Sequence, residues 1–168
     1  WHVLPDMIQY AKAITSGYFP LGGIGISDEI ADTMAASGAP WMHAYTYSAH
    51  PVGCAVALAM MDIVEGEDFP GQAATKGDRL LGGLGQALGD HPHVGEVRGL
   101  GMMGAVEIVK DKATGEEFPA AESVGPRIVA AGTERGLFSR VRGDVYMIAP
   151  PIVSTEAQID QIIETMRN

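Results

Sequence analysis

Hydrophobic positions in residues 69–168 recur with two different periods. Leu80, Leu84 and Leu88 are spaced four residues apart, which predicts an amphipathic helix that ends near His91. The stretches VGEVRG, MMGAVEIV, LFSRV and VYMIA are short and rich in residues that favour extended backbone, which predicts strands. This part of the chain therefore mixes helical and strand patterns.

Two further helices complete the same region. One is predicted from about Ala121 to Gly136, where a glycine is a common stop. The other begins at Thr155, which forms a capping box with Gln158. Its apolar positions follow the spacing i, i+3, i+4 and i+7, at Ile159, Ile162, Ile163 and Met166. Because helices and strands alternate, residues 69–168 are predicted to form a compact α/β domain.

Residues 1–68 show a different pattern and are expected to be an incomplete part of another domain. Met7–Ala11 is a short apolar run that could be a buried strand or a turn. Ser27 is a predicted cap for a helix that extends through about Ala36. Pro51 opens the stretch PVGCAVALAMMDIVEGE, which is small and apolar on nearly all sides and therefore predicts a buried helix.

Composition and charge narrow the partners of this chain. Its 168 residues are 46% hydrophobic, and the formal net charge is −10. An acidic surface repels phosphate groups, so nucleic acid and membrane are not expected as partners. The lone Cys54 excludes an internal disulfide, is expected to be a packed thiol, and favours a cytoplasmic protein. The chain starts at Trp1 with an apolar stretch, which indicates a piece of a longer protein.

One glycine motif suggests a nucleotide site but fails in context. Gly99, Gly101 and Gly104 in RGLGMMG match the GxGxxG spacing of dinucleotide-binding proteins. In those proteins a helix follows the glycines and directs its N-terminus at the pyrophosphate, whereas here the strand-like AVEIV follows. A nucleotide-binding module is thus a weak alternative. The five histidines show no paired metal-ligand spacing, so no metal site is expected.

Lys12 is the most unusual charged residue of the chain. It is the only Lys or Arg in the first 75 residues, and it lies between Ala11 and Ala13 beside the hydroxyl pair Thr15-Ser16. In apolar surroundings an ammonium group loses hydration, and its pKa falls. A neutral lysine amine can attack a carbonyl carbon and form a Schiff base. We therefore expect Lys12 to lie in a dry pocket; the alternative is an ordinary surface lysine.

Four stretches of the sequence resemble one family. PDMIQYAKAITSGYFPLGG, HAYTYSAHPVGCAVALAMMDIVE, EVRGLGMMGAVEIV and GLFSRVRGDVYMIAPPIVSTEAQID are similar, in this order, to segments of class III (ω) aminotransferases. These are pyridoxal phosphate (PLP) enzymes of fold type I. The resemblance implies that residues 1–68 are the end of the large PLP-binding domain. It implies that residues 69–168 are the small C-terminal α/β domain.

The resemblance also implies roles for individual residues. Lys12 would form the Schiff base with PLP and then move a proton as general base and acid. Thr46 would reach the phosphate of the cofactor in the neighbouring subunit, so the active site would lie at a homodimer interface. Arg140 resembles the arginine that binds the keto acid in the amine:pyruvate branch, and Arg98 resembles the carboxylate arginine of the ornithine branch. Arg140 is favoured, and Arg142 on the same strand face is a complication.

The expected activity is transfer of an amino group from a primary amine or ω-amino acid to a keto acid such as pyruvate. The sequence departs from the family at Ala13 and Ala49, where glycine is common. The family's phosphate loop, its ring-stacking aromatic residue and its aspartate for the pyridinium nitrogen precede the matching segments, so this chain alone is expected to be inactive. An aminomutase or decarboxylase of the same fold, or a non-catalytic interaction module, are the alternatives.

Overall fold

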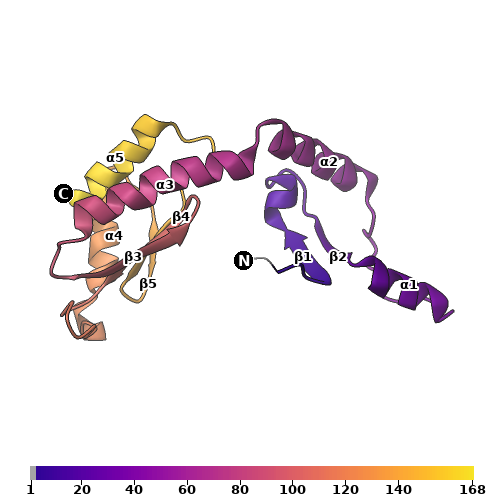
Figure 1. The fold of residues 1–168 in the computed structure, drawn as a ribbon, viewed down its shortest axis with the longest axis horizontal. Helices are drawn as coiled ribbons and strands as arrows, with labels where there is room; N and C mark the ends of the chain where they lie inside the picture. Colours follow the sequence, from indigo (N-terminus) through magenta and orange to yellow (C-terminus); the bar gives the residue numbers. More distant parts are fainter. Residues whose placement is uncertain (1–2) are drawn as a thin grey trace. The chain divides into compact units, whose positions relative to one another are not determined.

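A computed structural model describes residues 3–168 of the chain. The chain divides into two compact units, one ending at Glu67 and the other comprising Asp68–Asn168 (Figure 1). The expected division of the complete protein into domains after residue 68 stays a prediction. Each unit has its own arrangement of elements.

The first unit is built around an antiparallel pair of strands. Strand β1 (Met7–Ala11) pairs with β2 (Gly22–Ile26), in a register that places Ala11 opposite Gly22. A 3₁₀ turn, η1 (Lys12–Thr15), follows β1 directly. Two helices follow the strands, namely α1 (Asp28–Ala36) and α2 (Pro51–Gly66).

Both helices of the first unit differ in detail from the prediction. Ser27 occupies the N-cap of α1, but its hydroxyl makes no capping hydrogen bond. Helix α2 begins at Pro51 as expected, yet it is not a buried helix in this chain, since only Gly53 and Ala57 are buried. The side chain of Leu58 is 63% exposed, because the described residues cover one stripe of the helix only. Cys54, predicted to be packed, is exposed for the same reason.

The second unit carries a four-stranded antiparallel sheet in the order β3-β4-β6-β5. Its strands are β3 (Val94–Leu100), β4 (Met103–Ile108), β5 (Arg140–Arg142) and β6 (Val145–Ile148). Its helices are α3 (Phe69–Leu88), α4 (Val124–Glu134) and α5 (Glu156–Arg167), and η2 (Ala120–Glu122) is a short 3₁₀ turn. Figure 1 shows α5 alongside α3 on one side of the strands. The predicted α/β organisation of this region is confirmed.

The core of the second unit follows from its side-chain periodicity. Leu80, Leu84 and Leu88 of α3 are buried, as their spacing predicts, together with Val106 and Tyr146 from the sheet. Helix α5 has the predicted capping box between Thr155 and Gln158. Alternate residues of a strand point to opposite faces, so one face of the sheet packs on the helices and the other carries polar residues.

The GxGxxG stretch forms a hairpin and not a phosphate cradle. Gly99 and Gly104 pair across β3 and β4, and Gly101 lies in the turn with φ +55°, a conformation that favours glycine. A strand follows the glycines, as expected from AVEIV, and not the helix that a dinucleotide site requires. The glycines also allow close packing, because a Cβ atom on Gly77 of α3 would lie 2.4 Å from the backbone of Gly101.

Candidate active site

Lys12 lies at the exact point where β1 ends and the chain turns. Its backbone has φ +54°, in the left-handed region that a side chain with a Cβ atom rarely adopts. Such a conformation costs about 1–2 kcal/mol, and strain of this kind tends to be kept at functional sites. The side chain of Lys12 is exposed in this chain, so the described residues do not build the dry pocket that the sequence led us to expect.

The turn that carries Lys12 is closed by a buried threonine. Thr15 is 1% exposed, and its hydroxyl Oγ1 donates a hydrogen bond of 2.5 Å to the carbonyl oxygen of Phe19. The amide of Tyr18 donates to the carbonyl of Thr15 at 3.0 Å, and the amide of Ser16 donates to the carbonyl of Ala13 at 3.1 Å. These bonds hold residues 12–19 as one compact turn.

Thr46 lies in a second turn, immediately before α2. The amide of Tyr45 donates to the hydroxyl of Ser48 at 2.9 Å, and the amide of Ser48 donates back to the carbonyl of Tyr45 at 2.9 Å. Thr46 is exposed, and within the described part of the chain its hydroxyl makes no hydrogen bond. Ala49 has φ +54°, which explains in physical terms why glycine suits this position.

An aromatic contact joins the two turns. The ring of Phe19, which follows the Lys12 turn, lies 5.0 Å from the ring of His50, which follows the Thr46 turn. A Cβ atom on Gly53 would lie 2.8 Å from Phe19 Cδ1, so Gly53 leaves the space that this ring fills. Lys12 and Thr46 are therefore presented by turns that share one packing contact.

Sequence reasoning missed the part that Thr15 and the Phe19–His50 contact play in this arrangement. The hydroxyl pair Thr15-Ser16 beside Lys12 was the only signal in the sequence. It did not show which hydroxyl is buried, or that its partner is a carbonyl four residues along the chain.

The two candidate arginines lie on the polar face of the sheet in the second unit. In the strand register Arg98 is opposite Ala105, Ala105 is opposite Met147, and Met147 is opposite Arg140. The two arginines thus lie at opposite ends of one row that crosses the sheet. Three interstrand spacings separate them, or roughly 14 Å between backbones.

Their electrostatic surroundings differ. The guanidinium of Arg98 donates to the carboxylate of Glu96 at 2.9 Å and also to that of Glu107. The hydrogen bond to Glu107 is the main cause that raises the pKa of Arg98 above its usual value. Arg140 and Arg142 are exposed on the edge strand β5, and neither makes an ion pair with another described residue. Arg140 and Arg142 are therefore open to a carboxylate ligand, whereas Arg98 already has two carboxylate partners.

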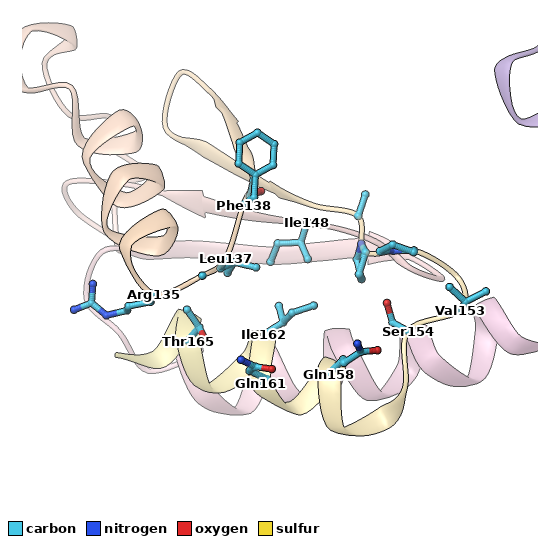
Figure 2. Close-up of a pocket in the computed structure, with 15 residues that line it drawn as sticks. Arg135, Leu137, Phe138, Ile148, Val153, Ser154, Gln158, Gln161, Ile162 and Thr165 are labelled. Carbon is cyan, nitrogen blue, oxygen red and sulfur yellow. The ribbon is translucent and has the colours of Figure 1, made fainter. Parts of the chain in front are cut away.

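A cavity of about 390 Å³ lies elsewhere in the second unit. Figure 2 shows Ile162 and Thr165 of α5 facing Leu137 and Ile148 across this space, with Phe138 at its rim. None of the four candidate residues lines it. In residues 3–168 no three His, Cys, Asp or Glu side chains gather closely enough to hold a metal ion. None of the helices within that range has both the length and the apolar character needed to span a bilayer.

Comparison with known proteins places these features in a family. The model of the family described as "Aminotransferase class-III" matches residues 1–168. Putrescine–pyruvate aminotransferase of Pseudomonas aeruginosa is 40% identical over 163 residues, which are 97% of this chain and 35% of that protein. Diaminobutyrate–2-oxoglutarate transaminase of Halomonas elongata is 39% identical over 166 residues, 96% of this chain and 35% of that protein.

Solved structures agree with the sequence relatives. The crystal structure of a thermostable (S)-enantioselective omega-transaminase from Thermomicrobium roseum superposes with a TM-score of 0.91 at 48% identity. The match covers 98% of this chain and 36% of that structure. An amine transaminase from an uncultivated Pseudomonas species, solved in a PLP-bound form, superposes with a TM-score of 0.92 at 38% identity, over 99% of this chain and 38% of that one. The chain therefore spans about a third of the length of the proteins it matches.

Proposed function

The chain belongs to the class III aminotransferases, which are PLP-dependent enzymes of fold type I, and we propose the reaction and the residue roles of the complete protein from that premise. The complete protein is a transaminase that moves an amino group from a primary amine or ω-amino acid to a keto acid such as pyruvate. The names of the matched omega-transaminase and putrescine–pyruvate aminotransferase support this substrate class.

Two residues of the first unit fit PLP by their chemistry. Lys12 offers a primary amine, which condenses with an aldehyde, on a turn whose backbone is already set. Thr46 offers an exposed hydroxyl that has no hydrogen-bond partner in the described part of the chain, and such a hydroxyl can donate to a phosphate oxygen. Bound PLP acts as an electron sink for the substrate carbon from which a proton is removed. Lys12 would hold the PLP of its own subunit, and Thr46 would hold the phosphate of the PLP in the neighbouring subunit.

The remaining roles follow from the same side chains. The Nζ atom of Lys12 accepts the proton from the substrate carbon and later returns it, as a general base and acid. Arg140 pairs with the carboxylate of the keto acid, since a planar guanidinium matches a carboxylate with two hydrogen bonds. The active site lies at a homodimer interface, where Thr46 serves the cofactor of the neighbouring subunit. The cytoplasmic location expected from the lone cysteine stays a prediction.

One observation carries this proposal above the others. The chain holds Lys12 in a left-handed backbone conformation that costs about 1–2 kcal/mol and would suit glycine better. The surrounding turn is closed by the hydrogen bond that the buried Thr15 donates to the carbonyl of Phe19. A surface lysine with no fixed orientation would not need a left-handed backbone, whereas a lysine that must present its amine in one direction does.

The test is substitution of Lys12 in the complete protein. In the unaltered protein, borohydride reduction with PLP should attach a pyridoxyl group to the peptide that contains Lys12. The Lys12→Ala variant should lose this label and the visible absorbance of the bound cofactor. Its transamination rate should fall by about 10²–10⁴-fold or more. Lys112→Ala, at an exposed lysine of the second unit, is the control.

Persistence of the label in the Lys12→Ala variant would show that another residue holds the cofactor. An assay of pyruvate consumption with a panel of amines separates transamination from aminomutase or decarboxylase activity in the same protein. A protein that binds PLP at Lys12 but consumes no keto acid with any amine would contradict the proposed reaction.

A further inference from the structure

The turn around Lys12 is held in place by residues other than the lysine itself. Lys12 and Ser16 both have positive φ values, 54° and 48°, on either side of Ala13–Thr15. Two residues in the left-handed region within one short turn are unfavourable for the isolated chain. Contacts elsewhere must therefore stabilise the turn.

Thr15 makes the side-chain hydrogen bond that closes this turn. Its side chain is the buried one in this turn, and its hydroxyl donates to the carbonyl of Phe19 at 2.5 Å. The bond spans four residues and closes the loop that leads from the Lys12 turn to Pro20 and β2. If the hydroxyl were removed, the Phe19 carbonyl would lose this partner, and the backbone could relax out of its strained form.

Phe19 is itself anchored to α2. Its ring packs on His50 at 5.0 Å and fills the space above Gly53. The hydrogen bond of Thr15 therefore connects the Lys12 turn to the start of a helix and not merely to a neighbouring loop residue. Within the described residues the Lys12 side chain makes no hydrogen bond, so the backbone of the turn, which fixes the Cα–Cβ direction, is what these residues contribute to the placement of the side chain.

We propose that Thr15 is a positioning residue for Lys12, and that its hydrogen bond to Phe19 sets the direction of the Lys12 amine toward PLP. The inference rests on the proposed function, because it assumes that Lys12 carries the cofactor. Thr15 touches neither substrate nor cofactor in this proposal. Its effect passes through the backbone of the turn.

The experiment compares three variants of the complete protein. Thr15→Val keeps the shape of the side chain and removes the hydroxyl, whereas Thr15→Ser keeps the hydroxyl and removes a methyl group. Thr33→Val is the matched control, because Thr33 donates the same kind of bond, to the carbonyl of Glu29 at 2.8 Å, from an exposed position on α1. The two readouts are the dissociation constant of PLP and the pH midpoint of the absorbance of the bound cofactor. The thermal midpoint of the cofactor-free protein checks that each variant folds.

We expect Thr15→Val to weaken PLP binding by about tenfold, in line with loss of one hydrogen bond, and to shift the pH midpoint. Thr15→Ser should restore the dissociation constant to within about twofold of the unaltered protein and should restore the pH midpoint, and Thr33→Val should leave both unchanged. Equal defects in Thr15→Val and Thr15→Ser would overturn the proposal, since packing and not the hydroxyl would then matter. Unaltered binding and pH midpoint in Thr15→Val would overturn it as well. Failure of the unaltered protein to bind PLP at Lys12 would instead contradict the proposed function, on which the role of Thr15 rests.

Discussion

Arg98 and Arg140 lie at opposite ends of one row of residues across the sheet of the second unit, with Ala105 and Met147 between them. The next row places Glu96 and Glu107 at the Arg98 end, and both carboxylates accept hydrogen bonds from Arg98. The sheet thus carries an arginine with two carboxylate partners at one edge, and at the other edge two arginines that make no ion pair with another described residue.

Together with the proposed reaction, this asymmetry predicts which arginine binds the keto acid. In the complete protein, Arg140→Ala should raise the KM for pyruvate by about tenfold or more, because a charge-assisted pair with the carboxylate is lost. Arg98→Ala should change that KM by less than about threefold, since its guanidinium already has two partners. Steady-state kinetics with varied pyruvate and a fixed amine measures both.

Arg142→Ala is the matched control for that experiment, because Arg142 lies on the same face of β5 two residues from Arg140. We expect a change of less than about threefold. A large KM increase in Arg142→Ala together with a normal Arg140→Ala variant would assign the carboxylate to Arg142. A large increase in Arg98→Ala alone would show that its ion pairs open when substrate binds.

The close approach of α3 to the β3–β4 hairpin predicts opposite effects for two glycines of the same helix. Gly77→Ala would place a Cβ atom 2.4 Å from the backbone of Gly101. The backbone cannot rotate away from this clash as a flexible side chain could, so stability should fall by about 2 kcal/mol or more. Gly82→Ala meets nothing within 4 Å and should stabilise by about 0.5–1 kcal/mol through helix propensity. Denaturant unfolding of the complete protein, monitored by circular dichroism, measures both changes.

Because the two glycines share one helix, the general effect of adding alanine cancels in the comparison. Equal effects of the two substitutions would mean that α3 does not pack against the hairpin as described. Stabilisation by Gly77→Ala would contradict the close contact between Gly77 and the backbone of Gly101.

An ion pair between α3 and α5 predicts a pH dependence of stability. Arg79 donates to both carboxylate oxygens of Asp160, at 2.8 and 2.7 Å, and this hydrogen bonding lowers the pKa of Asp160. A carboxylate with a lowered pKa in the folded state adds stability above its unfolded pKa of about 3.9 and loses it as the pH falls through the lowered value. The contribution is small, because both groups are exposed.

Asp160→Asn should therefore lower the thermal midpoint slightly at pH 7, by about 1–2 °C, and this difference should disappear in acid. Thermal unfolding of both proteins from pH 7 down to pH 2 gives the measurement. Asp78→Asn, at an exposed position of α3, is the control and should match the unaltered protein. A difference that persists unchanged at the lowest pH would show that packing, and not charge, links Asp160 to Arg79.

Much of the fold could be predicted because its signals are local. The leucine spacing of α3, the capping box of α5 and the apolar runs of the strands each depend on residues close in sequence, and all three predictions are confirmed. The burial of α2 and of Cys54 could not be predicted in the same way. An apolar pattern shows what a helix can bury, whereas the amount buried depends on which segments lie against it.

The sequence by itself determined the family, the order of helices and strands, and the choice of Lys12 as the candidate for a reactive amine, because each depends on residue type and short spacing. Only the tertiary structure decided that Arg98 is neutralised while Arg140 is open, and that Thr15 closes the lysine turn. The first depends on the register of the β3–β4 hairpin, which brings Glu107 to Arg98 and leaves Arg140 on the far edge of the sheet. The second depends on a buried hydroxyl that meets the carbonyl of Phe19, whose ring packs on His50 at the start of α2. Hydrogen bonds and ion pairs form over a few ångströms in space, and distance along the chain does not determine that separation.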